Sequence, residues 1–455
     1  MTLKTLTSGL LAAAVSFGAA HATTYTINAG GSSLAAPTYI AEFNLYTHGN
    51  TATGGTLAGH PSILFSFEAV GSGGGQKAIL NNDISQFQNL SSSILTYGTI
   101  VGTTVHIGAS DATLGIEAVP NPSGDTTGLD SAATGSYHSA INSSGSSTDG
   151  PMIQIPTFGV PVAIAYNSSV TLTLKYPQLC GVLSGKITDW HTLINTVPSG
   201  TTIKVVYRSD SSGTTFLLSQ YLDKVCSSSN SLFSTTALAK PTKYFITSGS
   251  NQGLLNTAPA NFTGESGSAA VASQAVATAN SLAYLSPDYT SIAPLSANTT
   301  SLKVAHLVNR NNNVSYTPTV SATETGLANP GTTGTNTTPP SPTNGGKTAA
   351  MDPQNWVPAI PDPSAGYPIV GYTTMDLSSC YAQKSAIGAS INAFLVAQYT
   401  NAYYETIIKN NGFAPLVNTA ASNYITAVKS TFLGNTYGYN LNIDNATTCA
   451  SYAGR

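Results

Sequence analysis

Residues 203–225 read IKVVYRSDSSGTTFLLSQYLDKV, in which an apolar segment, a polar loop and a second apolar run follow one another. The first apolar segment, 203–207, predicts a strand, and residues 216–225 predict a helix. A strand, a Gly- and Ser-rich loop and a helix also follow one another twice near the N-terminus. Strands that alternate with helices are typical of an α/β fold with a largely parallel sheet.

The rest of the chain extends this pattern. The segments expected to be strands or helices near the N-terminus are 25–27, 37–46, 63–70 and 76–81. A single core rarely organises about 430 residues, so we expect two lobes. Residues 23–157 and 290–455 are predicted to form lobe 1, and 158–289 lobe 2. The extended segments 160–166 and 281–285 are expected to cross between the lobes as a hinge.

Two segments are expected to lie outside the folded core. The basic start, the apolar run 10–20 and the ending Ala20-His21-Ala22 predict a signal peptide over residues 1–22 and a periplasmic or secreted protein. Residues 321–354 are rich in Thr, Pro, Gly and Asn, a composition that cannot bury a core. We therefore expect a flexible surface loop at about 321–354.

The composition excludes several classes of partner. Only 8% of the residues are charged, against about 25% in an average protein, and the net charge is −3 with 16 Lys and Arg. No basic face is available for nucleic acid, and an anion site has to be local and desolvated. The His residues are dispersed, so we expect no metal and no cofactor. We expect a monomer.

The chain has four cysteines, Cys180, Cys226, Cys380 and Cys449. An even number in an exported protein favours two disulfides. Three pairings are possible. Pairing of nearest neighbours, Cys180 with Cys226 and Cys380 with Cys449, keeps each bridge within one region of the chain.

Three Gly- and Ser-rich loops each precede a predicted helix: 30–34, 71–75 and 208–215. The start of a helix offers unpaired N–H groups and a partial positive charge, which suit an oxyanion. Most such loops only cap helices. The third is more specific, because the guanidinium of Arg208 matches a tetrahedral oxyanion and Asp210 is near enough to orient it. The alternative is a surface arginine beside a capped helix.

Asp111 ends the predicted strand that begins at His106, and a carboxylate is an unusual component of an anion site. An acceptor-only group is useful when the ligand carries a proton, as hydrogenphosphate does and sulfate does not. Asp111 would then reject sulfate. On the local sequence alone, Asp111 fits a helix-cap or turn residue as well as it fits a ligand of the anion.

Segments along nearly the whole chain resemble a known family. They are Val70-Gly71-Ser72-Gly73, Gly108-Ala109-Ser110-Asp111, Leu179–Ile187, Arg208–Thr215, Tyr284–Tyr289 and Phe413–Leu416. In order and spacing they resemble periplasmic phosphate-binding proteins of ABC phosphate uptake, and most closely the secreted DING proteins. Thr26-Ile27-Asn28-Ala29 stands where the DING signature reads Asp-Ile-Asn-Gly.

The resemblance implies a two-lobed periplasmic-binding-protein fold of class II, with the ligand in the cleft between the lobes. It also implies high-affinity binding of inorganic phosphate, a membrane ABC phosphate permease as partner, and the nearest-neighbour disulfides. The phosphate ligands that it implies are Ser33, Leu34, Ser72, Asp111, Arg208, Ser212, Gly213 and Thr214.

Two other functions compete with this one. A phosphatase acting on phosphate esters needs a nucleophile beside a base, and no Gly-x-Ser-x-Gly elbow is present in a strand-to-helix context. A secreted adhesive or structural protein would account for the low charge, but it leaves Arg208 and Asp111 unexplained. We therefore predict a binding protein and no enzyme, with a weak phosphatase activity as the open alternative, since a site that binds phosphate also binds phosphate esters.

Overall fold

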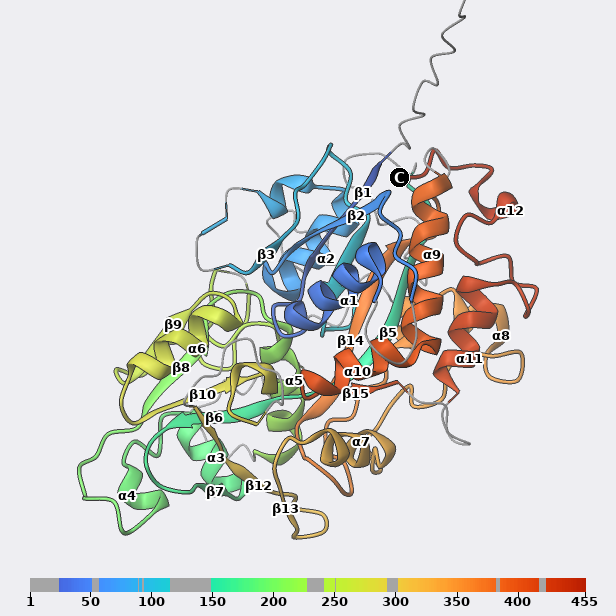
Figure 1. The fold of residues 1–455 in the computed structure, drawn as a ribbon. Coiled ribbons are helices and arrows are strands. Elements are labelled where there is room, and N and C mark those ends of the chain that lie inside the picture. The colour runs from blue at the N-terminus through green and yellow to red at the C-terminus, as the bar shows by residue number, and fades with distance from the viewer. Residues whose placement is uncertain are drawn as a thin grey trace, which may run out of the picture.

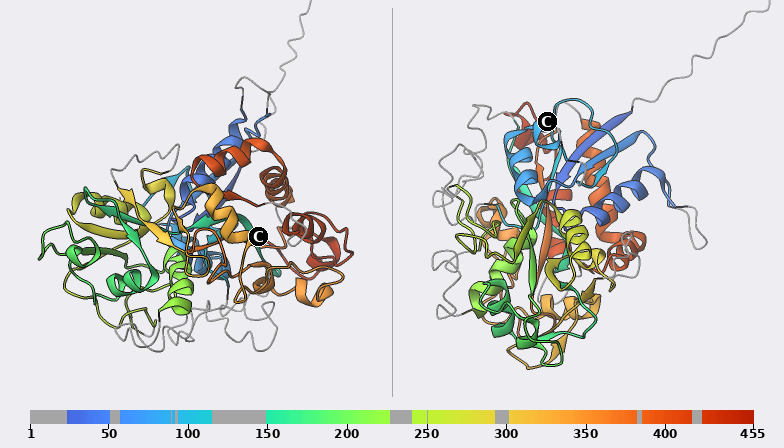
Figure 2. Two further views of the ribbon diagram at one scale, coloured as in Figure 1. Left: turned by 90° about the horizontal axis from the view of Figure 1, so that it is seen from below. Right: turned by 90° about the vertical axis from the view of Figure 1, so that its left-hand side faces the viewer.

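The computed structural model describes residues 24–50, 57–88, 90–91, 94–114, 149–226, 241–249, 251–292, 302–381, 385–416 and 423–455. The expected signal peptide lies outside these residues. Figures 1 and 2 show two bodies, each built around its own sheet. We call the body around the seven-stranded sheet lobe 1 and the body around the five-stranded sheet lobe 2. Within the described residues, none of the helices combines the length and the apolar character that a membrane span needs.

Lobe 1 contains a mixed sheet. Its strands, in order across the sheet, are β15 (Ala414–Pro415), β5 (Met152–Pro161), β14 (Val370–Ser378), β4 (Ile107–Ser110), β1 (Tyr25–Gly31), β2 (Ile63–Glu68) and β3 (Thr96–Tyr97). Strand β1 is parallel to β2 and β4, whereas β14, β5, β15 and β3 are antiparallel to their neighbours. Every residue of β5 and β14 is buried, as expected for central strands.

Figure 1 shows the helices of this lobe. They are α1 (Ala36–His48), α2 (Gly71–Asn81), α7 (Val320–Ala328), α8 (Gly346–Ala350), α9 (Ser385–Thr400), α10 (Ala402–Asn410), α11 (Tyr424–Val428) and α12 (Ala446–Cys449), with the short turns η1 (Ile84–Phe87), η5 (Pro353–Trp356) and η7 (Lys429–Leu433). Helices α1, α2, α7, α9 and α10 pack against the sheet, and α8, α11 and α12 lie farther out. Between α1, α9 and β2 the core is aromatic: Phe43 stacks on Phe65 at 4.2 Å between ring centroids and meets Phe394 at 5.1 Å.

Lobe 2 repeats the arrangement on a smaller scale. Its strands are, in order, β11 (Lys303–Val304), β6 (Ala163–Asn167), β10 (Ser281–Leu285), β8 (Lys204–Arg208) and β9 (Phe262–Glu265). Its helices are α3 (Tyr176–Leu183), α4 (Trp190–Leu193), α5 (Gly213–Val225) and α6 (Ser268–Ala277), followed by the turn η4 (Pro287–Tyr289). A small third sheet contains β13 (Ser315–Tyr316), β12 (His306–Val308) and β7 (Thr173–Leu174).

The predicted α/β class and two-lobed architecture are confirmed, but the expectation of a largely parallel sheet is wrong. Among the described strands, the parallel neighbours are β2, β1 and β4 in lobe 1, β10, β8 and β9 in lobe 2, and β12 and β7 in the small third sheet; the other neighbours are antiparallel. Long buried strands such as β5 and β14 look the same in sequence whether their neighbours are parallel or antiparallel.

The segment 321–354 also differs from the irregular loop expected there. It contains most of α7, all of α8 and the first residues of η5. Thr319 caps α7 by accepting from the N–H of Ala322 at 3.3 Å, and Thr323 and Gly326 are buried. Small residues allow α7 to approach β5 and β14 closely, and composition alone could not reveal that packing.

Strand β5 remains in the lobe 1 sheet to Pro161, and β6 enters the lobe 2 sheet at Ala163, so the segment 160–166 crosses between the lobes as predicted. The segment 281–285, also predicted to cross, does not: it is β10, which pairs with β6 and β8 inside the lobe 2 sheet. The structure contains the disulfides Cys180–Cys226 and Cys380–Cys449, the nearest-neighbour pairing. The first joins α3 to the end of α5, and the second ties the end of β14 to α12.

Candidate functional site

Three of the predicted ligand segments follow strands of the lobe 1 sheet. Residues 32–34 follow β1, Ser72 is in the first turn of α2 after β2, and Asp111 follows β4 directly. Because β1, β2 and β4 are parallel, their carboxyl ends lie at one edge of the sheet. The sequence thereby brings three separate loops to one place.

The carboxylate of Asp111 is the buried centre of this group, with 2% of the residue exposed. Ser32 Oγ lies 2.8 Å from both carboxylate oxygens and donates to them, and Ser72 Oγ lies 3.4 Å from Oδ2. The N–H of Asp111 donates to Ser72 Oγ at 3.0 Å. Burial raises the pKa of Asp111 to about 6, although Ser32, Thr373, Arg208 and Ser72 all act in the opposite direction.

Arg208 faces this group from lobe 2. It is the last residue of β8, is 1% exposed, and binds Asp210 through two bonds, Nε to Oδ1 at 2.7 Å and Nη2 to Oδ2 at 2.5 Å. Burial opposes its positive charge, but Asp210 outweighs this effect and keeps the pKa of Arg208 above its usual value. Burial likewise opposes the charge of Asp210, and Arg208 nevertheless keeps the pKa of that carboxyl below its usual value.

The remaining lobe 2 residues belong to the start of α5. Ser212 is the cap of α5, and its Oγ accepts from the N–H of Thr215 at 3.1 Å. Gly213 is the first helical residue, and Thr214 Oγ1 lies 3.4 Å from Arg208 Nη1. The helix begins three residues earlier than predicted, so the N–H groups of its first turn belong to the predicted ligand segment.

The two groups are in direct contact across the lobes. The N–H of Gly73 donates to the carbonyl of Ser211 at 3.1 Å. A Cβ atom on Gly213 would lie 2.2 Å from Ser72 Oγ and 2.5 Å from Asp111 Oδ2. The structure therefore brings Ser72 and Asp111 of lobe 1 against the start of α5, and it represents a closed form.

Ser268 is a candidate site residue that the sequence analysis missed. It is the first residue of α6 and is 1% exposed. Its Oγ lies 3.0 Å from Ser33 Oγ and accepts from Arg208 Nη1 at 3.2 Å, so it connects predicted ligands of both lobes. The signal was present in Ser266-Gly267-Ser268, a Gly and Ser turn before a helix, of the same kind as the three that were chosen.

Leu34, a predicted ligand through its backbone N–H, is buried in the short segment between β1 and α1.

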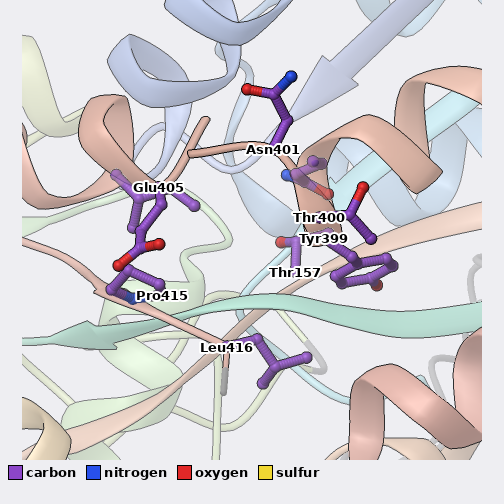
Figure 3. A pocket seen from close by; sticks show the side chains of 9 residues that line it. Thr157, Tyr399, Thr400, Asn401, Glu405, Pro415 and Leu416 are labelled. Carbon is purple, nitrogen blue, oxygen red and sulfur yellow. The ribbon is translucent and has the colours of Figure 1, made fainter. Parts of the chain in front are cut away.

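A separate small pocket lies at the corner between α9 and α10 and has a volume of about 100 Å³ (Figure 3). Its lining residues are Thr157, Gln398, Tyr399, Thr400, Asn401, Glu405, Ile408, Pro415 and Leu416. Glu405 is paired with Lys409 at 2.5 Å. None of the predicted phosphate ligands lines this pocket, so it is distinct from the candidate anion site.

Fold and site together define a class of protein: two lobes, each an α/β unit, that close over a buried cluster of hydroxyls, one guanidinium and one carboxylate. Residues 18–330 match the model of the PBP superfamily domain. The match covers more than half of the chain, and the chain belongs to the PBP superfamily.

Individual relatives narrow the class. Alkaline phosphatase L of Pseudomonas aeruginosa PAO1 is 32% identical over 390 residues, which cover 85% of this chain and 86% of that protein. The structure resembles PfluDING, a high-affinity periplasmic phosphate-binding protein solved with phosphate, at 27% identity and a TM-score of 0.65 over 95% of this chain and 99% of that one. It also resembles the phosphate-binding protein of Stenotrophomonas maltophilia, at 28% identity and a TM-score of 0.63 over 95% and 100%. The predicted kinship with DING-type proteins is confirmed.

Proposed function

We propose that this protein binds one inorganic hydrogenphosphate ion between its lobes. The observation that carries the proposal is a pair of oppositely charged side chains at the contact between the lobes, where buried Arg208 in lobe 2 faces buried Asp111 in lobe 1. A guanidinium donates hydrogen bonds to phosphate oxygens, while an ionised carboxylate accepts a hydrogen bond from the one hydroxyl group of hydrogenphosphate. Phosphate-binding relatives that align over nearly the whole chain support the same ligand.

Each group has a defined role in this proposal. Ser33, Leu34 and Ser72 donate hydrogen bonds to the ion from lobe 1, and Asp111 accepts a hydrogen bond from the hydroxyl group of the ion. Arg208, Gly213 and Thr214 donate from lobe 2. Ser212 accepts from the N–H of Thr215, so its own hydroxyl proton is free to point at the ion. Closure excludes water and strengthens these charge-assisted bonds.

Isothermal titration of the phosphate-stripped protein tests the proposal. We expect one phosphate per chain with a dissociation constant of about a micromolar or less, equivalent to about −8 kcal/mol. Sulfate at the same pH should give no heat. Absence of phosphate binding would refute the proposal, and equal binding of both anions would refute the role of Asp111.

Phosphate-ester hydrolysis is the second candidate. It is favoured by the name of the Pseudomonas relative and by Ser32, whose hydroxyl donates to a carboxylate that could act as a base. Against it, Asp111 and Arg208 are at most 2% exposed, so the organic group of an ester would have to lie between lobes that are in contact. Release of p-nitrophenol from p-nitrophenyl phosphate that stops in Arg208→Ala would favour this alternative.

The close approach at Gly213 gives a further prediction. Gly213 does not have a positive φ, so alanine fits the backbone, but its Cβ would collide with Ser72 and Asp111. Gly213→Ala should therefore weaken phosphate binding at least about tenfold, which is about 1.4 kcal/mol. The melting temperature of the phosphate-free variant should not fall, because alanine is the better helix former. Parental affinity in calorimetry would contradict the closed contact.

Biological context follows from the sequence and the relatives. We infer export to the periplasm or beyond by the signal peptide over 1–22. The sequence predicts lobes at 23–157 with 290–455 and at 158–289, and we move these bounds to Pro161 and to beyond Val304, because β5 and β11 extend that far in their sheets. The chain would act as a monomer that passes phosphate to a membrane ABC permease. The related periplasmic protein PfluDING supports the location.

A further inference from the structure

A buried lysine makes a second contact between the lobes, apart from the predicted ligands. Lys243 is 3% exposed, and its Nζ donates to Oε1 of Gln76 at 2.8 Å. Lys243 belongs to lobe 2, where its carbonyl accepts from the N–H of Ser212 at 2.9 Å, whereas Gln76 belongs to α2 of lobe 1. An ammonium group removed from water loses several kcal/mol of hydration unless partners replace it.

Gln76 connects this lysine to the segment that carries Asp111. Its Nε2 donates to the carbonyl of Ala112, the residue after Asp111, at 2.8 Å. Gln154 Nε2 lies 3.3 Å from the same carbonyl and donates to Asp376 Oδ1 at 2.7 Å. A buried polar network therefore extends from Lys243 to the backbone beside the predicted proton acceptor.

A carboxylate in lobe 1 stabilises the buried ammonium group of Lys243. Asp376 is fully buried on β14 and lies near enough to interact with the positive charge of Lys243. The start of α5, which Lys243 adjoins, is the part of lobe 2 that contacts Asp111. When the lobes separate, the bond to Gln76 breaks and the ammonium regains water. The contact therefore belongs to the closed form.

We propose that Lys243 is a positioning residue for closure: its ammonium binds Gln76 as the lobes meet, steadies the segment 111–112 and slows release of the ion. The proposal rests on phosphate binding. It follows from a general property of two-state proteins, in which a contact made in only one form shifts the equilibrium toward that form. Discrimination between phosphate and sulfate should not depend on Lys243, since this residue is not the proposed acceptor of the hydrogen bond from hydrogenphosphate.

The test measures phosphate release by stopped flow, together with calorimetry, for the full chain and for Lys243→Met. We expect release about tenfold faster and affinity about tenfold weaker, with sulfate still rejected and the melting temperature of the phosphate-free protein unchanged. Lys204→Met removes an exposed lysine from β8 of the same lobe and should match the parent. Lys243→Arg, which keeps the charge and donors, should restore part of the loss.

A double-mutant cycle with Gln76→Met isolates the contact. Gln76→Met acts from the other lobe and should accelerate release to a similar extent, and the double variant should release phosphate no faster than either single variant. Additive effects, or parental release by Lys243→Met, would overturn this inference while leaving phosphate binding intact. A parent that binds no phosphate would overturn the proposed function and this inference with it.

Discussion

Arg208→Ala should weaken phosphate binding by about 100-fold or more, the largest loss that we expect from a single lobe 2 residue. Arg208 is almost fully buried, and Asp210 holds its guanidinium through two hydrogen bonds. In the proposed complex it supplies the positive charge nearest to a doubly charged anion, in a region from which closure removes water. Removing one partner of such a buried charge pair costs about 2–5 kcal/mol, and each 1.4 kcal/mol is tenfold in affinity. Calorimetry with phosphate measures the loss.

The same change leaves Asp210 without its partner, so lower stability has to be separated from weaker binding. Arg208→Met combined with Asp210→Asn removes both charges, and it should remain folded by circular dichroism while binding equally poorly. The pair Arg310 and Asp362, 2.7 Å apart and remote from the site residues in sequence, provides the matched control as Arg310→Met with Asp362→Asn. Parental affinity in a folded Arg208 variant would remove this residue from the site.

Local sequence was sufficient to predict the elements that carry the site. The helix predicted over 37–46 is α1, and the strand predicted over 63–70 contains β2. Apolar runs bounded by Gly- and Ser-rich turns determine these elements, because the turn chemistry and the apolar pattern agree. The disulfides followed from the small number of possible pairings and from the resemblance.

The parts that sequence did not reveal depend on long-range packing. Thr323 and Gly326 look like loop residues, but they become buried when α7 packs against β5 and β14. Lys243 carries no sequence signal, because its partner Gln76 is 167 residues away and lies in the other lobe. Ser268 did have a signal, but a Gly and Ser turn before a helix is too common to select one residue without knowing which strand ends meet.

Asp111→Asn should reduce discrimination between phosphate and sulfate at least about tenfold, by weakening phosphate and admitting sulfate. The parental carboxylate is buried, and burial raises its pKa to about 6. At about pH 8 it is therefore ionised and accepts hydrogen bonds only, as hydrogenphosphate requires. Sulfate has no proton to donate, so the parent would place two sets of oxygen lone pairs against each other in a dry site. An asparagine amide can instead donate to either ion.

The measurement is a pair of titrations, phosphate and sulfate, at about pH 8 for the parent and for Asp111→Asn. Asp288→Asn changes another buried aspartate, in lobe 2, and should leave the ratio of the two affinities unchanged. Ser32 donates to both oxygens of Asp111, and the asparagine carbonyl can still accept that bond, so the loop should keep its conformation. If the variant were as selective as the parent, another group would accept the hydrogen bond from hydrogenphosphate. Asp111 would then serve only to hold Ser32 and Ser72 in place.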